Sequence, residues 1–188
     1  GFHASNAESY VGIDPNWEVM KNYPRQNELY ETYKKTEFIH SPAEDVDLED
    51  RKFDMVFTSP PYFHVERYSK DENQSWMRYG NDIDSWMDGF LYPTLNNCWE
   101  ALEDGGTMII NIADVYSGDN QYVQICDPMN DFISNLSDAH YSGCFGLKLS
   151  KRPQSNNDRE ESKYKKIIEP MWVWKKGDDR SLEQIIDD

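Results

Sequence analysis

Residues 53–62 read Phe-Asp-Met-Val-Phe-Thr-Ser-Pro-Pro-Tyr, and this stretch decides the fold expected for the chain. The run Phe53–Thr58 is mostly apolar and rich in strand-forming residues, which predicts a buried strand. Pro60 and Pro61 then end it, because proline has no backbone N–H to donate to a strand ladder. Open α/β sheets bind ligands beyond the carboxyl ends of their strands. We therefore expect a ligand site at residues 59–62.

The turn at residues 59–62 can present two hydrogen-bond acceptors. The Ser59 hydroxyl and a carbonyl of the proline segment can accept both N–H bonds of an amino group, which directs the nitrogen lone pair toward an electrophile. Tyr62 offers a flat face on which a base can stack. A plain turn, in which proline only interrupts the strand, is the alternative. The full run after an apolar strand is more specific than Pro-Pro alone, and it favours the functional interpretation.

The rest of the chain alternates short apolar runs with longer amphipathic ones, which is typical of an α/β fold. We expect strands at residues 9–14, 37–40, 53–58, 107–112, 142–149 and 166–174, the last two as antiparallel neighbours. Residues 107–112 are the most apolar run and predict a strand buried on both faces. We expect helices at residues 15–35, interrupted near Pro24, and at residues 83–103 and 129–136. Residues 62–81 and 150–165 predict loops.

The composition is that of a folded domain. The chain has 188 residues, of which 38% are hydrophobic and 14% aromatic, and this suits one domain with a sizeable core. No apolar run approaches the roughly 20 residues of a membrane span, and no secretory signal opens the chain. Cys98, Cys126 and Cys144 lie far apart and indicate neither a zinc site nor a disulfide framework. Reduced thiols in a cytoplasmic protein are the simpler interpretation.

The net charge of −16 argues against phosphate contacts, which need Lys and Arg. The charge is unevenly distributed, because residues 148–176 carry nine basic and four acidic side chains, a local charge of +5. This basic strip could face a phosphate backbone, and Lys151 and Arg152 within it are our candidates for substrate contact. A solvated loop with ordinary surface lysines explains the same pattern equally well.

Residues 53–63 resemble the catalytic motif of the N4-cytosine and N6-adenine DNA methyltransferases, which have Asp, Asn or Ser before Pro-Pro-Tyr. The Ser form is more similar to the N4-cytosine members. The resemblance implies methyl transfer from S-adenosylmethionine to an exocyclic amino nitrogen of a flipped base in double-stranded DNA, in a prokaryotic or phage restriction-modification setting. It implies no metal and no covalent intermediate, because an amine nitrogen attacks directly.

The resemblance also implies roles for individual residues at the target. It gives Ser59, Pro60, Pro61 and Tyr62 to catalysis and Phe63 to binding of the base. Phe63 and the other aromatic side chains of residues 62–79 could instead pack the loop against the protein.

The resemblance extends to the cofactor side. Residues 11–14 look like the family's second strand, whose terminal acid, here Asp14, accepts hydrogen bonds from the cofactor ribose. Ala43 and Glu44 resemble the loop along the adenine ring, and Thr58 is also given to the cofactor. Each has an ordinary alternative, because Asp14 before a proline is a common helix N-cap and Glu44 could be a plain solvated acid.

Two features depart from the family pattern. Pro42 stands where many relatives have an acid beside the adenine. A Phe-x-Gly-x-Gly-like strand, which cradles the methionine end of the cofactor, should lie about 20 residues before Asp14, and the sequence does not contain it there. We therefore expect an incomplete class I methyltransferase domain over residues 1–176, with a mostly parallel sheet, an antiparallel terminal strand and no first strand. Residues 177–188 predict a tail.

Two other functions stay open at this point. One is methyl transfer to an RNA base or a protein amide, although such relatives more often resemble Asn-Pro-Pro-Tyr, so Ser59 counts against it. The other is a degenerate, non-catalytic binding module, which the absent glycine motif and the charge of −16 favour.

Overall fold

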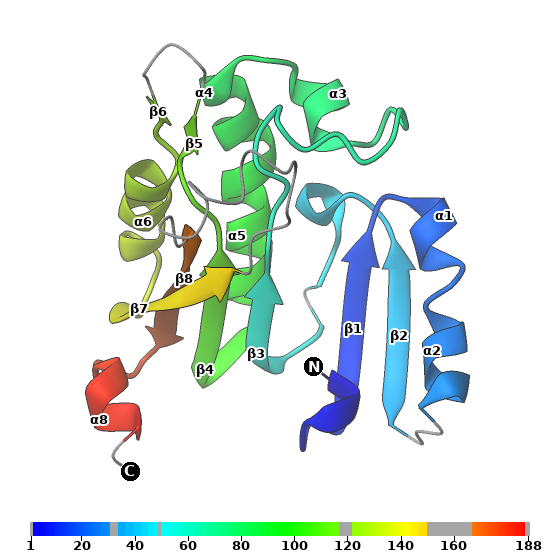
Figure 1. Cartoon of the computed structure of the whole chain (residues 1–188). Helices are drawn as coiled ribbons and strands as arrows, with labels where there is room; N and C mark the ends of the chain where they lie inside the picture. Colours follow the sequence, from blue (N-terminus) through cyan, green and yellow to red (C-terminus); the bar gives the residue numbers. More distant parts are fainter. Residues whose placement is uncertain (1, 31–33, 49, 117–121, 150–166, 187–188) are drawn as a thin grey trace, which may run out of the picture. The chain divides into compact units, whose positions relative to one another are not determined.

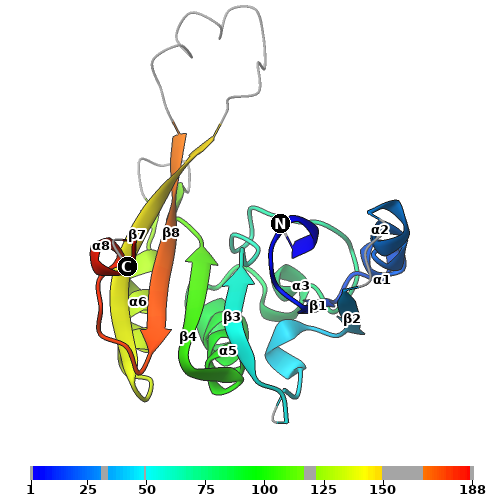
Figure 2. The same ribbon diagram turned by 90° about the horizontal axis from the view of Figure 1, so that it is seen from below.

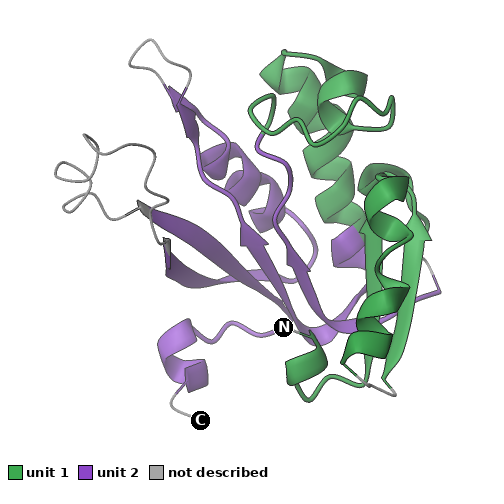
Figure 3. Cartoon of the chain, turned by 45° about the vertical axis from the view of Figure 1, so that its right-hand side comes forward, with its two compact units in different colours: residues 1–47, 63–97 green, residues 48–62, 98–188 purple. Residues whose placement is uncertain are grey.

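A computed structural model of the chain describes residues 2–30, 34–48, 50–116, 122–149 and 167–186. The chain divides into two compact units (Figure 3). Unit 1 comprises Gly1–Asp47 and Phe63–Asn97, and unit 2 comprises Leu48–Tyr62 and Cys98–Asp188. Each unit therefore combines two separate stretches of sequence. Among the helices that the structure describes, none has the length and apolar character needed to cross a bilayer.

Unit 1 begins with a parallel pair of strands, β1 (Ser9–Asp14) and β2 (Lys35–His40). Helices α1 (Trp17–Met20) and α2 (Pro24–Leu29) lie between them in the chain (Figure 1). Pro24 starts α2, a position where its missing N–H has no helical partner to lose. The two predicted strands, and the helical segment interrupted at Pro24, are confirmed.

The second part of unit 1 is mainly helical. It contains α3 (Ser75–Tyr79), α4 (Ile83–Trp86), a π-helical turn η3 (Met87–Leu91) and most of α5 (Tyr92–Glu100), whose last three residues belong to unit 2. Trp86, Leu91 and Leu95 are 0% exposed and form its apolar centre. The prediction that residues 62–81 are irregular throughout is wrong, because α3 lies within them. The helix predicted at 83–103 is present, but it contains the π turn and ends at Glu100.

Unit 2 is built on a four-stranded sheet in the order β3-β4-β8-β7 (Figure 2). The strands are β3 (Phe53–Thr58), β4 (Leu102–Asn111), β8 (Ile167–Lys176) and β7 (Ala139–Leu149). β3 and β4 run parallel, whereas β8 is antiparallel to both β4 and β7. The two final strands predicted as antiparallel neighbours are therefore confirmed.

Helix α6 (Cys126–Ser134) packs on one face of this sheet. Met108 and Ile110 of β4 point to this face and are 0% exposed. Trp174, which pairs with Met108, donates its indole N–H to Asn130 of α6 at 3.1 Å. A buried indole with its N–H paired joins the apolar layer to the helix without leaving an unsatisfied donor.

The opposite face of the four-stranded sheet is more open. Met55 and Phe57 of β3 are 55% and 59% exposed, and Ile109 of β4 is half-buried. Successive side chains alternate between the two faces, and β3 is the edge strand in the pairing of the described strands. The predictions that β3 is buried, and that residues 107–112 are buried on both faces, are therefore wrong.

Lys176 fixes the junction between α5 and β4. Its ammonium group donates to the carbonyls of Trp99 and Leu102, both at 3.0 Å, near the carboxyl end of the helix. β4 begins at Leu102, earlier than predicted, because Leu102 already pairs with Phe53 before the register shifts. The remaining short elements are η1 (Phe2–Ala4), η2 (Ala43–Asp45), β5 (Val115–Tyr116), β6 (Tyr122–Val123) and α8 (Leu182–Ile186).

Candidate functional site

The predicted site residues fall into both units. Thr58 and residues 59–62 belong to unit 2, whereas Asp14, Ala43, Glu44 and Phe63 belong to unit 1. The structure therefore describes the candidate site as two groups of residues, one in each unit.

The turn after β3 carries the four predicted catalytic residues. Ser59 is exposed, Pro60 is buried, and Pro61 and Tyr62 are half-buried. Thr58, the last residue of β3, is half-buried and lies within the ladder with β4. Because Pro60 and Pro61 have carbonyls but no N–H, the backbone of these two residues presents acceptors only. Ser59 thus adds a surface hydroxyl to a rigid, acceptor-rich turn.

Asn111 lies at the same end of the unit 2 sheet and was missed by the sequence analysis. Thr58 pairs with Ile110, so Ser59 and Asn111 are the next residues of two parallel strands. Asn111 is buried, and its amide donates to the Pro170 carbonyl at 3.0 Å. A polar residue inside the apolar run 107–112 was the signal available in the sequence. Its amide therefore joins the end of β4 to Pro170 of β8, next to the turn at residues 59–62.

Asp14 ends β1 at the carboxyl edge of the parallel pair. Its Oδ1 accepts from the Asn16 backbone N–H at 2.7 Å, which holds the carboxylate in place. Asn16 itself is the N-cap of α1 and accepts from the Glu18 N–H at 3.1 Å. The alternative in which Asp14 caps the helix is therefore wrong, because Asn16 occupies the cap position.

The edge of unit 1 fits the ribose of the cofactor in its donor and acceptor chemistry. Among the described residues, no hydrogen-bond donor contacts the second oxygen of Asp14, Oδ2, so this half-buried carboxylate can accept from a hydroxyl. Asp14 pairs with His40, and the η2 turn, which includes Ala43 and Glu44, begins soon after β2 ends. The structure therefore brings Asp14 and the η2 turn to the same end of the β1–β2 pair.

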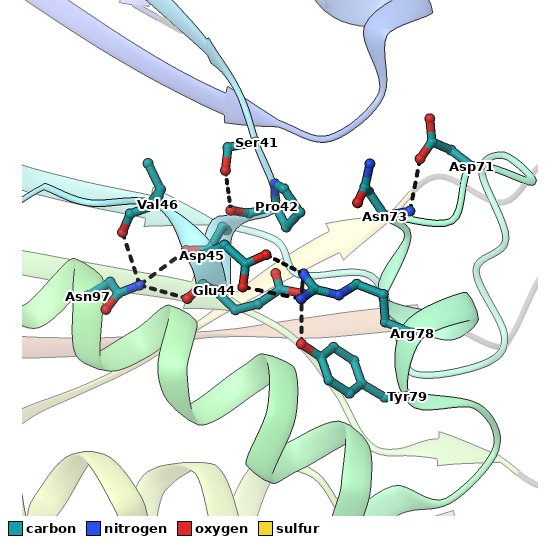
Figure 4. A network of polar contacts seen from close by, with 11 residues as sticks. Ser41, Pro42, Glu44, Asp45, Val46, Asp71, Asn73, Arg78, Tyr79 and Asn97 are labelled. Carbon is teal, nitrogen blue, oxygen red and sulfur yellow. Dashed lines mark hydrogen bonds and ion pairs between the residues drawn. The ribbon is translucent and has the colours of Figure 1, made fainter.

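Glu44 lies in a network of polar contacts (Figure 4). Its side chain is 3% exposed, and its Oε1 accepts from Arg78 at 2.7 Å and from the Tyr79 hydroxyl at 3.1 Å. Burial raises the pKa of this carboxyl, although the Arg78 charge acts in the opposite direction. The interpretation of Glu44 as a plain solvated acid is wrong. Its contact with adenine stays a prediction.

The sequence analysis missed Arg78 and Asn97, and it considered Tyr79 only as a loop aromatic that could stack on a base or pack the loop. Arg78 also donates to both oxygens of Asp45, at 2.7 and 3.2 Å. Asn97 donates from its amide to carbonyls of the η2 region, those of Ala43, Glu44 and Val46, at 3.4, 3.1 and 3.3 Å respectively. No local motif announces these contacts, because the partners lie more than thirty residues apart in the chain.

Phe63 is buried in unit 1, with 3% of its surface exposed. Its ring lies edge-on to Trp86, with centroids 5.8 Å apart, and it contacts His64 at 4.5 Å. Its φ of 49° is uncommon for a residue with a side chain, and the buried ring holds it there. This geometry favours packing over base contact, which for Phe63 stays a prediction.

The other loop aromatics differ in their exposure. The Trp76 indole donates to the Ser69 carbonyl at 3.2 Å, and the Arg67 guanidinium lies 5.0 Å from the centre of its ring. Tyr79 is held by Glu44, whereas Tyr68 is 65% exposed. Tyr68 is therefore the loop aromatic with the most surface available to a partner.

The predicted basic strip lies mainly outside the described residues, and Lys151 and Arg152 are among those outside. Lys148 is described and exposed. Lys175 pairs with Asp178 at 3.1 Å, and Lys176 donates to one carbonyl of α5 and one of β4. These last two lysines therefore support the fold, and contact of the strip with DNA stays a prediction.

Comparison with known proteins agrees with this arrangement. The model of a family described as DNA methylase matches residues 53–186. A Type II beta methyltransferase, M.BslI of Bacillus sp. (strain NEB-606), is 26% identical over 143 residues. The match covers 69% of this chain but only 15% of that relative, so this chain spans a small part of its length.

Solved structures show the same fold. A protein described as a class I S-adenosylmethionine-dependent methyltransferase from Listeria monocytogenes matches with a TM-score of 0.53 at 14% identity, covering 89% of this chain and 44% of that one. A SAM-dependent methyltransferase from Methanosarcina mazei matches with a TM-score of 0.53 at 12% identity, covering 89% and 82%. The predicted α/β class I methyltransferase fold is confirmed, and by the family match over residues 53–186 this chain belongs to the DNA methylase family.

Proposed function

We propose that the chain transfers a methyl group from S-adenosylmethionine to an exocyclic amino nitrogen of a flipped base in double-stranded DNA, with N4 of cytosine favoured over N6 of adenine. The observation that carries this proposal is the exposed Ser59 on the Pro-Pro turn that follows β3. Membership of the DNA methylase family supports DNA as the substrate. The description of the Bacillus relative as a Type II methyltransferase supports a restriction-modification setting.

The residues of the catalytic turn orient the target nitrogen. The Ser59 hydroxyl and the Pro60 carbonyl accept the two N–H bonds of the amino group, which turns the nitrogen lone pair away from them. The same acceptors disperse the positive charge that grows on nitrogen during attack. Tyr62 stacks on the base and holds its plane. Asn111 stabilises the neighbouring strand end, so that the turn keeps its shape.

Asp14 and the η2 turn would hold the cofactor. The Oδ2 of Asp14 would accept a hydrogen bond from a ribose hydroxyl, and the backbone around Ala43 and Glu44 would contact the adenine. When bound, S-adenosylmethionine supplies an electrophilic methyl group on a sulfonium sulfur. The protein residues need only bind and orient the reactants, because an amino nitrogen attacks such a carbon directly.

The cysteines support direct transfer without a thiolate nucleophile. Burial raises the pKa of Cys98 to about 11. Burial and the Asp114 charge raise the pKa of Cys126 to about 12. Burial also raises the pKa of Cys144. At neutral pH these thiols are protonated and are therefore weak nucleophiles.

Methyl labelling would test the substrate class. Three separate reactions contain the protein and radiolabelled S-adenosylmethionine. The first also contains unmethylated genomic DNA, the second total RNA and the third a protein extract. We expect label in DNA, and N4-methylcytosine after digestion to nucleosides. N6-methyladenine would support the function but correct the base. Label in RNA or protein, without label in DNA, would overturn the proposal.

Calorimetric titration with S-adenosylmethionine would test the cofactor site independently of the substrate. We expect binding that Asp14→Ala weakens about tenfold, which corresponds to ~1.4 kcal/mol. Glu18→Ala, at a neighbouring exposed acid, is the matched control and should bind as the wild type does. Equal affinity of the wild type and Asp14→Ala would remove Asp14 from the cofactor site.

A further inference from the structure

The chain that leaves the catalytic turn enters unit 1 as a long loop. Residues 63–74 have no helix or strand, and α3 follows directly. This segment carries the exposed Tyr68 and the cationic Arg67, which lies over the Trp76 ring. Loops of this length in compact domains are commonly functional. The loop leads into α3, which ends with Arg78 and Tyr79, and we call these two residues the loop anchor.

Arg78 joins this loop to the η2 turn. Its guanidinium donates to Glu44 at 2.7 Å and forms a bidentate ion pair with Asp45 (Figure 4). Arginine forms such forked pairs because its N–H groups match the two oxygens of a carboxylate. The Tyr79 hydroxyl is a second donor to Glu44. Two consecutive residues of the loop anchor thus bind two consecutive acids of the turn.

The η2 turn is held from a second direction by Asn97. The single amide nitrogen of Asn97 reaches the carbonyls of Ala43, Glu44 and Val46. The backbone of the turn is therefore fixed to α5, while its side chains are fixed to α3. A shift in the position of the η2 turn would therefore act on Arg78 and Tyr79 through these hydrogen bonds.

Gly89 is a second feature that bears on the position of Tyr79, because the Tyr79 ring packs directly against this glycine. A Cβ at Gly89 would lie 2.2 Å from the Tyr79 ring, far inside van der Waals contact. Gly89 lies in the π-helical turn η3, where a glycine has an entropic cost. The glycine is explained by the close approach of the ring, which brings the loop anchor against the helix.

We propose that Arg78 is a positioning residue that couples the η2 turn to the segment at residues 63–80, so that cofactor binding at the η2 turn orders the loop that directly follows residues 59–62. This inference rests on the proposed function, which gives the η2 turn to the cofactor and residues 59–62 to the target base. A buried ion pair is by itself weak evidence for stability, and fixing one arrangement of two elements is among its best-attested roles. Coupling of this kind is reciprocal between two ligands.

Hydrogen exchange read by mass spectrometry tests the coupling on the whole chain. S-adenosylhomocysteine, which binds without turnover, is added to the wild type and to Arg78→Gln. In the wild type we expect the ligand to slow exchange at residues 63–80 by about threefold or more. In Arg78→Gln the slowing should persist at residues 9–16 and be lost at residues 63–80. Exchange at Met108 and Ile110 corrects for any change in global stability.

Three further variants make the test specific. Arg78→Lys keeps the charge without the fork, and we expect it to restore only part of the slowing. Gly89→Ala should reproduce Arg78→Gln, because it displaces Tyr79 without touching a charge. Arg180→Gln is the matched control, since Arg180 also forms a forked pair, with Asp178, in the C-terminal segment. It should behave as the wild type does.

The hydrogen-exchange results distinguish failure of the coupling from failure of the proposed function. If the ligand slows residues 9–16 but the loop responds equally in the wild type and Arg78→Gln, the coupling is overturned and the cofactor site stands. If the ligand binds nowhere, the proposed function falls and the coupling falls with it. In ligand-free protein, Arg78→Gln should speed exchange at both residues 43–46 and 75–79. No change at either segment would overturn the anchoring itself.

Discussion

The η2 turn of unit 1 and the Pro-Pro turn of unit 2 are held in opposite ways. The η2 turn depends on side chains that are distant in sequence, those of Arg78 and Asn97. Residues 59–62 depend mainly on their own prolines and on β3, which precedes them, with Asn111 stabilising the neighbouring strand end. A turn held by its own backbone loses function when its own residues change. A turn held by distant partners is sensitive to substitutions that never touch the ligand.

Ser59→Ala is the sharpest way to test the Pro-Pro turn. It removes one of two acceptors from the target nitrogen and leaves the rigid backbone intact. We expect the rate of methyl transfer to fall by about 100-fold, corresponding to ~2.7 kcal/mol, while the cofactor affinity and the melting temperature stay unchanged. Ser134→Ala, at an exposed helical serine, serves as control. A Ser59→Ala protein with full activity would show that the backbone carbonyls alone orient the nitrogen.

Arg78→Gln should have the next largest effect, this time on stability. It leaves the 3% exposed Glu44 carboxylate without its charged partner, whereas Glu44→Gln removes the buried charge itself. We expect Arg78→Gln to cost about 2 kcal/mol, below the value for fully buried pairs because Arg78 is 27% exposed. Glu44→Gln should cost less, about 1 kcal/mol. Urea unfolding measures the free energy of unfolding of both variants. A larger loss for Glu44→Gln than for Arg78→Gln would contradict the view that the burial of the Glu44 charge dominates the energetics of this ion pair.

The same contrast explains what could be predicted from the sequence. β1, β3 and the turn at residues 59–62 were predictable because each is a contiguous run whose local chemistry decides its structure. The antiparallel pairing of β7 and β8 was predictable because the two runs are consecutive in the order of strands. These elements need only neighbours in sequence.

The rest depends on contacts that no local pattern encodes. The bonds from Arg78 to Glu44 and from Asn97 to the η2 turn join residues far apart in the chain. The exposure of Met55 and Phe57 depends on which face of the sheet α6 covers, and that is set by packing. The interpretation of Glu44 as solvated was wrong because burial belongs to the assembled unit.

Asn97→Ala tests the second anchor of the η2 turn with a smaller effect. It removes the amide donor shared by the carbonyls around Ala43, and we expect a loss of about 1 kcal/mol in unfolding free energy. Asn135→Ala removes a comparable amide, which donates to the Asp131 carbonyl at 2.7 Å on an exposed helix end. That control should cost a few tenths of a kcal/mol, about the usual effect of a surface substitution. Equal costs would mean that the turn does not depend on Asn97.

The smallest expected effect is the pH dependence contributed by Glu44. Burial raises the pKa of this carboxyl in the folded protein, so the folded state binds its proton more tightly than the unfolded state does. The stability due to the protonated group is therefore complete below its ordinary value of 4.5, and it is lost as the pH rises through the higher folded value. The unfolding free energies of the wild type and of Glu44→Gln are measured from below pH 4.5 upward. Their difference gives the contribution of Glu44 to the pH dependence of stability, because the amide does not titrate. We expect the wild type to lose stability relative to Glu44→Gln as the pH rises. A gain instead would mean that the Arg78 charge outweighs burial, and the η2 turn would then be held mainly by its ion pair.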